Sequence, residues 1–254
     1  MINTVCESFR LNNIDAVIFD KDGTLTDSSI YWSEIIKRRA KKIQNDFLLT
    51  KENYFELVRV MGLNISTNKL LPEGPIAIKS RKEVINKINS HLVKKNINVT
   101  HEYLEKIFKE IHENFSTEAF KFIVPVLPAY KLVKVLKNFN VKLILLTSDT
   151  KKNADEAIRV LKLENYFDLV VGGDSGFGDK RLGNSCKQIC KKLNLKTQKV
   201  ISIGDAPVDN EMAINGDLKA SILVESGQIC FETLSQFSKY CVKDLSEIKI
   251  ESNI

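Results

Sequence analysis

The residues best suited to chemistry are two aspartates that follow a short apolar run near the N-terminus. Residues 16–19 are apolar and lead directly into Asp20 and Asp22, which one residue separates. Two carboxylates this close repel each other unless a proton or a cation lies between them. A hard divalent cation with oxygen ligands, for which Mg²⁺ is the best candidate, would stabilise both. The alternative is an ordinary turn, because Asp, Gly and Thr are common turn residues.

Further polar residues follow apolar runs or lie in loops later in the chain: Thr147 and Ser148, Lys180, and Asp205 with Asp209. Each alone fits a helix cap, a surface lysine or a loop. In a parallel sheet, however, the carboxyl ends of the strands share one edge. We therefore expect these groups to converge with Asp20 and Asp22.

Together these residues have the chemistry of phosphoryl transfer. Asp20 can attack phosphorus and form an aspartyl-phosphate. Asp22 can protonate the leaving oxygen and then take a proton from the incoming water. The hydroxyl of Thr147 and the backbone amide of Ser148 can bind phosphoryl oxygens, and Lys180 can supply positive charge.

The same residues predict a metal site. Asp20, Asp205 and the backbone carbonyl of Asp22 are the expected ligands of Mg²⁺. Asp209 is expected to hold a metal-bound water or to orient a ligand.

The elements that position these residues alternate between strand and helix patterns. Buried strands are predicted at 16–19, 141–146, 169–171, 200–203 and 220–224, with a short last strand at 240–242. Helices are predicted at 129–139, 151–161 and 184–193, with another from 211 to 215. This alternation is typical of βαβ units and a parallel sheet. Residues 29–124 instead have helical periodicity almost throughout, which predicts an all-helical insert.

Two segments of the chain resemble motifs of the haloacid dehalogenase-like (HAD) hydrolases. Residues 20–28 resemble the first motif, DxDGT(L/V), and residues 204–209 resemble the fourth, GDxxxD. Thr147 is similar to the second motif and Lys180 to the third. The resemblance implies an α/β, Rossmann-like parallel-sheet core, formed by residues 1–28 and 125–254. It also implies a cap at 29–124, similar to the caps of phosphoglycolate phosphatase-like and β-phosphoglucomutase-like members.

The resemblance further implies Mg²⁺-dependent hydrolysis of a phosphate ester through Asp20. Asp22 favours a phosphatase or a phosphomutase, because members that act on carbon–halogen bonds lack this second acid. Two features depart from the pattern. Arg181 follows Lys180, where many relatives have proline, so Lys187 and Lys191 stay open as substitutes. The other departure is Lys21 between the two acids; we expect its side chain to point away from the cation and assign it no catalytic role.

Substrate choice is expected to depend on the insert, which would close over the site and exclude water. The candidate specificity element is the loop 71–81, where Lys79 and Arg81 could meet a second anionic group. Plain surface charge is the alternative for both residues. The basic cluster at 37–42 is interpreted as a solvated helix face in preference to a contact with nucleic acid or an anionic substrate.

Composition excludes several classes of protein. The chain of 254 residues is 43% hydrophobic and 28% charged, which is ordinary for a globular protein and long enough for a sizeable core. No apolar run has the length of a membrane span, and the first residues do not have the pattern of a signal peptide. The five cysteines are scattered, which favours free thiols in a reducing compartment and a cytoplasmic location.

The leading hypothesis is a Mg²⁺-dependent phosphatase of a small phosphorylated metabolite, such as phosphoglycolate, a sugar phosphate or a nucleotide. The alternatives are a phosphomutase of the β-phosphoglucomutase type, a non-catalytic HAD-like binding protein, and an enzyme that processes nucleic-acid ends. We expect a small-molecule substrate, no nucleic-acid or membrane partner, and a monomer.

Overall fold

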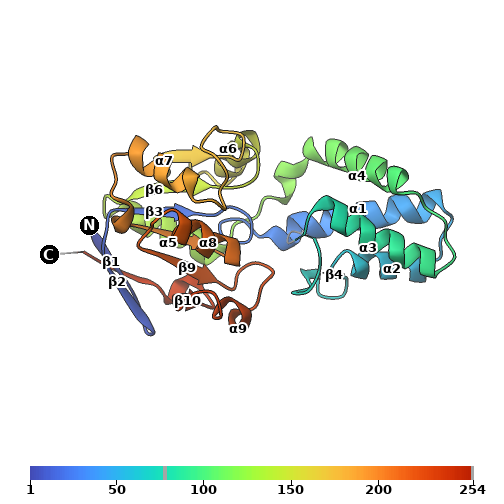
Figure 1. Ribbon diagram of the computed structural model, residues 1–254, viewed down its shortest axis with the longest axis horizontal. Coiled ribbons are helices and arrows are strands. Elements are labelled where there is room, and N and C mark those ends of the chain that lie inside the picture. The colour runs from blue at the N-terminus through green and yellow to red at the C-terminus, as the bar shows by residue number, and fades with distance from the viewer. Residues whose placement is uncertain (77–78, 253–254) are drawn as a thin grey trace. The chain divides into compact units, whose positions relative to one another are not determined.

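The computed structural model describes residues 1–76 and 79–252 (Figure 1). Its contacts divide the chain into two compact units: Met1–Asp27 with Ile123–Ile254, and Ser28–Phe122. We call the first the sheet unit and the second the helical unit. These bounds lie within two residues of those that the sequence suggests for a core and a cap.

A six-stranded, entirely parallel sheet forms the centre of the sheet unit, in the order β10-β9-β8-β3-β6-β7. Its strands are β3 (Ala16–Phe19), β6 (Lys142–Leu146), β7 (Leu169–Val171), β8 (Val200–Gly204), β9 (Ala220–Val224) and β10 (Cys241–Val242). This arrangement confirms the predicted α/β fold class. The chain runs from β3 outward through β6 and β7, and then returns to the other side of β3 as β8. β3 therefore lies between β6 and β8, both of which are distant from it in the sequence.

Helices cover both faces of the sheet, because successive residues of a strand point to opposite sides. Val17 and Phe19 of β3 pack in one apolar cluster with α5 (Leu127–Lys137) and α6 (Lys151–Val160). Ala16 and Ile18 pack in another with α7 (Asn184–Lys192) and α8 (Pro207–Asn215). Short elements complete this part of the chain: η2 (Thr197–Lys199), α9 (Phe231–Leu234) and η3 (Leu245–Glu247).

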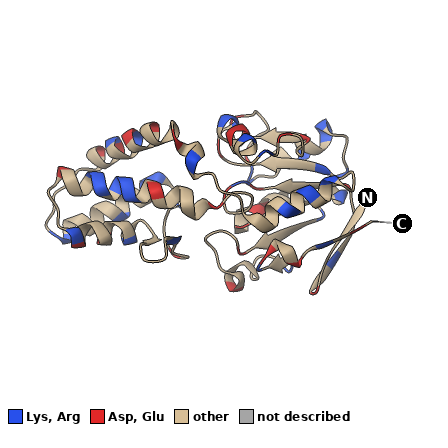
Figure 2. Cartoon of the chain, turned by 180° about the vertical axis from the view of Figure 1, so that it is seen from behind, with Lys and Arg blue, Asp and Glu red and all other residues tan. Residues whose placement is uncertain are grey.

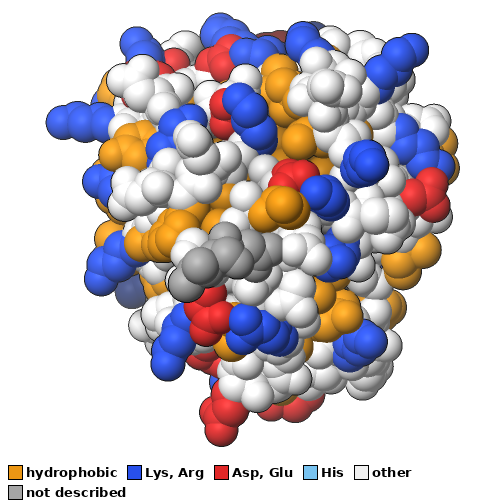
Figure 3. All heavy atoms as spheres, turned by 90° about the vertical axis from the view of Figure 1, so that its left-hand side faces the viewer, with side chains coloured by type: hydrophobic (Ala, Val, Ile, Leu, Met, Phe, Trp, Pro, Cys, Tyr) orange, Lys and Arg blue, Asp and Glu red, His pale blue; other side chains and the backbone are white. Residues whose placement is uncertain are grey.

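A small antiparallel sheet, which no local sequence pattern indicates, joins the two ends of the described chain. It has the order β11-β1-β2, with β1 (Ile2–Cys6), β2 (Phe9–Ile14) and β11 (Lys249–Ser252). Lys and Arg side chains on the face of the molecule at the chain termini are scattered among acidic and apolar ones (Figure 3).

The helical unit has its own apolar core, to which α1, α2, α3 and α4 all contribute. Its elements are α1 (Ser28–Asp46), α2 (Lys51–Val60), β4 (Leu63–Asn64), β5 (Lys69–Leu70), α3 (Arg81–Lys94), α4 (His101–Ser116) and η1 (Ala119–Phe122). Hydroxyl side chains start three of its helices: Thr50 caps α2, Ser80 caps α3 and Thr100 caps α4. The unit is helical as expected, except for the short β4–β5 hairpin.

The basic cluster at 37–42 differs in one respect from the solvated face that the sequence suggested. Basic residues gather along α1 (Figure 2), and Lys37, Arg38 and Lys42 bond to Asn68, to Glu34 and Glu118, and to Asp46 respectively. Arg39, in contrast, is only 4% exposed and lies on the inward face of the helix. The interpretation is therefore wrong for this one residue.

Candidate active site

The sheet brings the candidate residues to one edge, because they follow adjacent strands. Asp20 follows β3, and its backbone amide continues the ladder by donating to the carbonyl of Ile203 at 2.9 Å. Thr147 follows β6, and its amide donates to the carbonyl of Val171 at 3.0 Å. Asp205 directly follows β8. These are the carboxyl ends of three neighbouring strands, where open α/β sheets bind their ligands.

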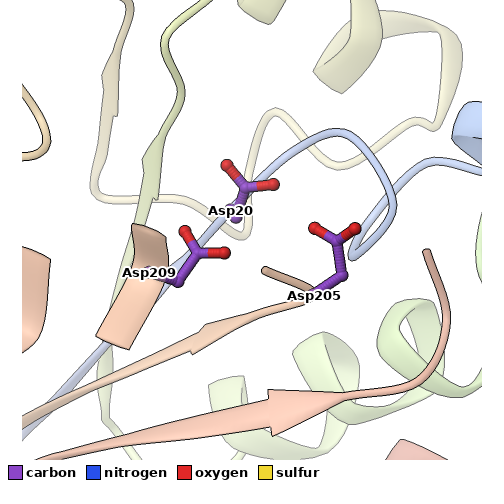
Figure 4. A group of neighbouring side chains, drawn as sticks. All are labelled: Asp20, Asp205 and Asp209. Atoms are coloured by element: carbon purple, nitrogen blue, oxygen red, sulfur yellow. The ribbon is translucent and has the colours of Figure 1, made fainter. Parts of the chain in front are cut away.

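Three carboxylates meet at this edge. One oxygen from each of Asp20, Asp205 and Asp209 lies within 4.8 Å of the others. Figure 4 shows the three side chains facing a common space, with Asp209 coming from α8 and Asp205 from the end of β8. The second carboxylate oxygen of Asp209 accepts a hydrogen bond from the amide of Ala206 at 3.2 Å, which fixes its orientation.

Lys180 supplies the positive charge of this group. Its ammonium lies 2.5 Å from Oδ1 of Asp20 and 2.7 Å from Oδ1 of Asp209, and its side chain is 7% exposed. Lys187, the first possible substitute, pairs with Asp217 at 2.9 Å on the exposed side of α7. The structure thus brings Lys180 to Asp20 although arginine follows it in the sequence.

The electrostatics of the group favour a bound cation. Burial, together with the negative charges of Asp20 and Asp209, raises the pKa of Asp205 well above its usual range. Burial also raises the pKa of Asp20, although the ammonium of Lys180 opposes this rise. Burial alone would lower the pKa of Lys180, but the carboxylates of Asp20 and Asp209 outweigh it, so the lysine stays charged. One ammonium among three carboxylates leaves net negative charge, which suits a hard divalent cation.

Two glycines make room for Asp205 beside the first motif. Gly23 has φ +86°, and a Cβ there would come within 2.3 Å of Oδ2 of Asp205. A Cβ at Gly227 would come within 1.7 Å of the same oxygen. Ser226 donates from its hydroxyl to the carbonyl of Gly23 at 2.6 Å, which ties the two loops together. The carboxylate of Asp205 thus fits between Gly23 and Gly227 only because neither residue has a side chain. This close packing holds the carboxylate of Asp205, the proposed metal ligand, in place.

The substitution Gly23→Ala should therefore damage both the site and the fold. A non-glycine residue at positive φ costs about 1–3 kcal/mol of stability, and the new methyl group would also displace Asp205. A displacement of about 1 Å at a catalytic group lowers the rate by roughly 10²-fold. Gly176→Ala is the matched control, since Gly176 has φ +77° and a methyl group there would have no atom within 4 Å. Thermal unfolding and kcat should show a loss of stability in both variants but a loss of rate only in Gly23→Ala.

Asp22 belongs to a second network of hydrogen bonds, separate from the network that joins Lys180 to Asp20 and Asp209. Its carboxylate accepts hydrogen bonds from Nζ of Lys21 at 2.9 Å and from the hydroxyl of Thr26 at 3.2 Å. Lys21 also bonds to Asp149 at 2.8 Å and is 7% exposed. Burial raises the pKa of Asp22 above its usual range, although the charge of Lys21 opposes the rise. A carboxyl group with a raised pKa suits general acid catalysis.

The remaining predicted residues differ in their surroundings. Thr147 is buried, and its hydroxyl accepts a hydrogen bond from the amide of Asp149 at 3.1 Å. Ser148 is exposed beside it, at the end of the strand. Lys79 lies 3.9 Å from Glu83, and both side chains are exposed, as is Arg81. Ala77 and Ile78 of the proposed specificity loop lie outside the described residues.

Sequence reasoning missed three residues at this edge, Ser226, Gly227 and Asp149, and it named Lys21 without predicting what its side chain contacts. Ser226 and Gly227 follow β9, the neighbour of β8. Asp205 was predicted because residues that follow parallel strands meet at one edge of the sheet, and the same argument could have identified these two residues. The contact of Lys21 with Asp149 was not predicted for another reason. A single sequence gives no sign that a lysine and an aspartate 128 positions apart share one contact.

The comparisons with known proteins identify the class of this chain. The model of the haloacid dehalogenase-like hydrolases matches residues 14–217, so the chain belongs to this family of hydrolytic enzymes. It is 28% identical over 202 residues to a phosphorylated carbohydrates phosphatase of Thermotoga maritima, covering 79% of this chain and 80% of that one. It is 24% identical to a phosphoglycolate phosphatase of Aquifex aeolicus, covering 81% and 83%.

Solved structures show the same fold. A HAD-superfamily hydrolase of subfamily IA from Geobacter sulfurreducens has a TM-score of 0.65 at 15% identity, covering 92% of this chain and 94% of that one. A Thermotoga maritima protein designated as a β-phosphoglucomutase has a TM-score of 0.64 at 22% identity, covering 92% and 96%. Within residues 1–76 and 79–252, no helix has the length and apolarity needed to cross a membrane.

Proposed function

We propose that this enzyme is a Mg²⁺-dependent phosphatase that hydrolyses a small phosphorylated metabolite. The observation that carries the proposal is the contact of Asp20 with Lys180 at 2.5 Å, inside a group of three carboxylates. A nucleophilic carboxylate, a neutralising ammonium and a cation site are what transfer of a phosphoryl group to an aspartate requires. The curated relatives named as phosphatases support the same reaction class.

The proposed reaction uses both networks, that of Asp20 and that of Asp22. A carboxylate oxygen of Asp20 attacks phosphorus and forms an aspartyl-phosphate, while Asp22 gives its proton to the leaving alkoxide. Asp22 then takes a proton from a water that attacks the phosphoryl group, which releases inorganic phosphate and regenerates Asp20. Lys180 neutralises developing negative charge, and Lys21 holds the carboxyl group of Asp22.

The remaining site residues complete the proposal. The hydroxyl of Thr147 and the amide of Ser148 would bind phosphoryl oxygens. Mg²⁺ would be held by Asp20, Asp205 and the carbonyl of Asp22, with Asp209 supporting it, and would stabilise the charge on the phosphoryl oxygens. The helical unit would act as a cap that selects the substrate, with Lys79 and Arg81 as candidate contacts. The described cysteines are all free, which supports a cytoplasmic location as part of this proposal, and we expect a monomer.

The test is phosphate release from a panel of metabolites, with and without Mg²⁺. The panel should contain phosphorylated carbohydrates, phosphoglycolate, pyrophosphate and nucleoside monophosphates, because the relatives act on compounds of the first three kinds by their names. We expect Mg²⁺-dependent release from at least one of them. Isomerisation of a sugar phosphate that requires a bisphosphate primer would instead indicate a phosphomutase. Absence of both activities would indicate a binding protein.

The carboxylate cluster also predicts how Mg²⁺ affects stability at different pH values. An aspartate with a raised folded pKa contributes stability below its unfolded pKa of about 3.9, and this contribution is lost as the pH rises through the folded pKa. The chelated protein should therefore lose melting temperature as the pH rises from about 4 toward 8, because Asp205 then becomes charged beside Asp20 and Asp209. Mg²⁺ should restore the melting temperature at pH 8 and have little effect at pH 4.

The matched variant for this measurement is Asp205→Asn, which removes one of the repelling charges without changing the shape of the side chain. Chelated Asp205→Asn should depend less on pH than the wild type and should gain less from Mg²⁺. If Mg²⁺ raised the melting temperature of both proteins equally, the cation would not bind at Asp205.

A further inference from the structure

Lys21 forms a buried bridge between the loop that follows β3 and the loop that follows β6. Its ammonium lies 2.9 Å from the carboxylate of Asp22, in its own loop, and 2.8 Å from Oδ2 of Asp149, in the other loop. The side chain of Lys21 is 9% exposed, and the carboxylate of Asp22 is the most exposed of the three groups. A buried ammonium thus joins the proposed acid to the neighbouring loop.

Asp149 is held in place at its end of this bridge. Its other carboxylate oxygen, Oδ1, accepts hydrogen bonds from the amide of Thr150 at 2.7 Å and from Nδ2 of Asn153 at 2.8 Å. Thr150 is the N-cap of α6, and Asn153 lies in the first turn of this helix. Both oxygens of Asp149 therefore have partners, one at the start of a helix and the other at Lys21.

The backbone of Asp149 also contacts the threonine that is proposed to bind the phosphoryl group. The amide of Asp149 donates to the hydroxyl oxygen of Thr147 at 3.1 Å, and Thr147 is buried. Because this oxygen accepts, the hydroxyl keeps its own hydrogen to donate to a phosphoryl oxygen. Asp149 is thus linked to Thr147 through its amide and to the proposed acid through Lys21.

The carboxyl group of Asp22 is also held within its own loop. The hydroxyl of Thr26 donates to Oδ1 of Asp22 at 3.2 Å. The amides of Leu25 and Thr26 both donate to the carbonyl of Lys21 at 2.9 Å, which closes the loop on itself. The ammonium of Lys21 then sets where the carboxyl group of this loop lies relative to Asp149.

We propose that Lys21 and Asp149 are positioning residues that orient the carboxyl group of Asp22 toward the leaving oxygen while Thr147 holds the phosphoryl group. This inference rests on the proposed function and deepens it. As the P–O bond breaks, its electron pair goes to the leaving oxygen, which takes the proton of Asp22. A proton donor must lie within hydrogen-bond reach of the atom that it protonates. Lys21 and Asp149 act through the donor and take no part in the bond changes themselves.

Two esters with different leaving groups test this role. An alkoxide must be protonated as it leaves, whereas p-nitrophenolate is stable without a proton, so only the alkyl ester depends on Asp22 as an acid. The quantity to compare is kcat/KM, which covers the steps up to departure of the leaving group. A displacement of about 1 Å at a catalytic group costs roughly 10²-fold in rate, so Lys21→Met should lose about that factor on the best alkyl phosphate of the metabolite panel. On p-nitrophenyl phosphate its kcat/KM should stay close to that of the wild type.

Asp149→Asn tests the other end of the bridge and keeps the size of the side chain. A neutral acceptor bonds an ammonium about half as strongly as a carboxylate does, so we expect a loss of about tenfold on the alkyl phosphate. The double variant should be no slower than Lys21→Met, because the side chain of Asp149 acts through Lys21. Lys142→Met is the matched control. Lys142 pairs with Asp168 at 2.8 Å, at the opposite end of β6 from Thr147, and its loss should change kcat/KM for neither ester.

The two esters also separate failure of this inference from failure of the proposed function. Equal losses on both esters in Lys21→Met would show that Lys21 only stabilises the fold, and unchanged kcat/KM for the alkyl phosphate in both single variants would show that the bridge has no role; either result overturns the inference alone. If Lys21→Met does not fold, Asp149→Asn carries the same comparison. A wild type that releases phosphate from no ester would overturn the proposed function, and this inference with it.

Discussion

Asp20→Asn should abolish turnover, with kcat lower by roughly 10⁴-fold or more, as is usual when an enzyme loses its covalent nucleophile. An amide oxygen is a poor nucleophile toward phosphorus, and it cannot form the acyl phosphate that the proposed mechanism requires. The carboxylate of Asp20 also contacts Lys180, so the substitution removes one negative charge from a group of three. The measurement is phosphate release at saturating substrate, with and without Mg²⁺.

The control for this prediction is Asp155→Asn, the same chemical change in an exposed side chain of α6 that pairs with Lys151. This variant should retain the rate of the wild type. A second readout is mass spectrometry of acid-quenched protein, which should show a phosphorylated peptide containing residue 20 in the wild type only. Turnover that persists in Asp20→Asn would contradict the covalent mechanism, although it would leave the phosphatase class intact.

The parallel sheet could be predicted from the sequence because each of its strands can be recognised from its own short run of apolar residues. Residues 16–19, 169–171 and 220–224 are strands with the predicted bounds, and the other three strands of the parallel sheet differ by one residue at one end. A parallel strand that is covered on both faces is an uninterrupted apolar run, which is easy to recognise. The strand-end rule then places Asp20, Thr147 and Asp205 at one edge before any coordinates are known.

The antiparallel sheet could not be predicted in the same way. Its strands lack a continuous apolar run, and one of its two strand pairings joins residues from opposite ends of the chain. Residues Phe9–Ile14 have the sequence FRLNNI, in which only part of one face is apolar. This strand pairs with the neighbouring β1 in a hairpin, and β1 pairs in turn with residues near the other end of the chain, where Ile2 faces Ser252. Tertiary pairing of this kind overrides weak local propensity.

The burial of Arg39 could have been predicted from helical periodicity, but the basic residues around it in the sequence obscure the pattern. Ile36, Ala40 and Ile43 define an inward stripe on α1, and position 39 falls on it. Among five basic residues in six positions, an arginine is readily assigned to the surface with its neighbours. Helical spacing, applied to charged residues as strictly as to apolar ones, would have found it.

Lys180→Met should reduce both the rate and the stability of the enzyme. The ammonium is the partner of two buried carboxylates, those of Asp20 and Asp209, at 2.5 and 2.7 Å. Removing one partner of a buried ion pair costs about 3–5 kcal/mol, because the charge that remains is uncompensated. Loss of one positioned electrostatic group also lowers kcat by about 10²–10³-fold. Denaturant unfolding and steady-state kinetics of the chelated and Mg²⁺-loaded protein measure the two effects.

Mg²⁺ separates the structural part of this effect from the catalytic part. A divalent cation at the three carboxylates would replace part of the lost positive charge, so saturating Mg²⁺ should recover much of the stability of Lys180→Met. It should not recover the rate, because the cation cannot take the place of the ammonium beside Asp20. Lys187→Met, which removes an exposed ion pair with Asp217, should change neither quantity appreciably. A Lys180→Met enzyme with normal kcat would show that this lysine holds the carboxylates in place and takes no part in phosphoryl transfer.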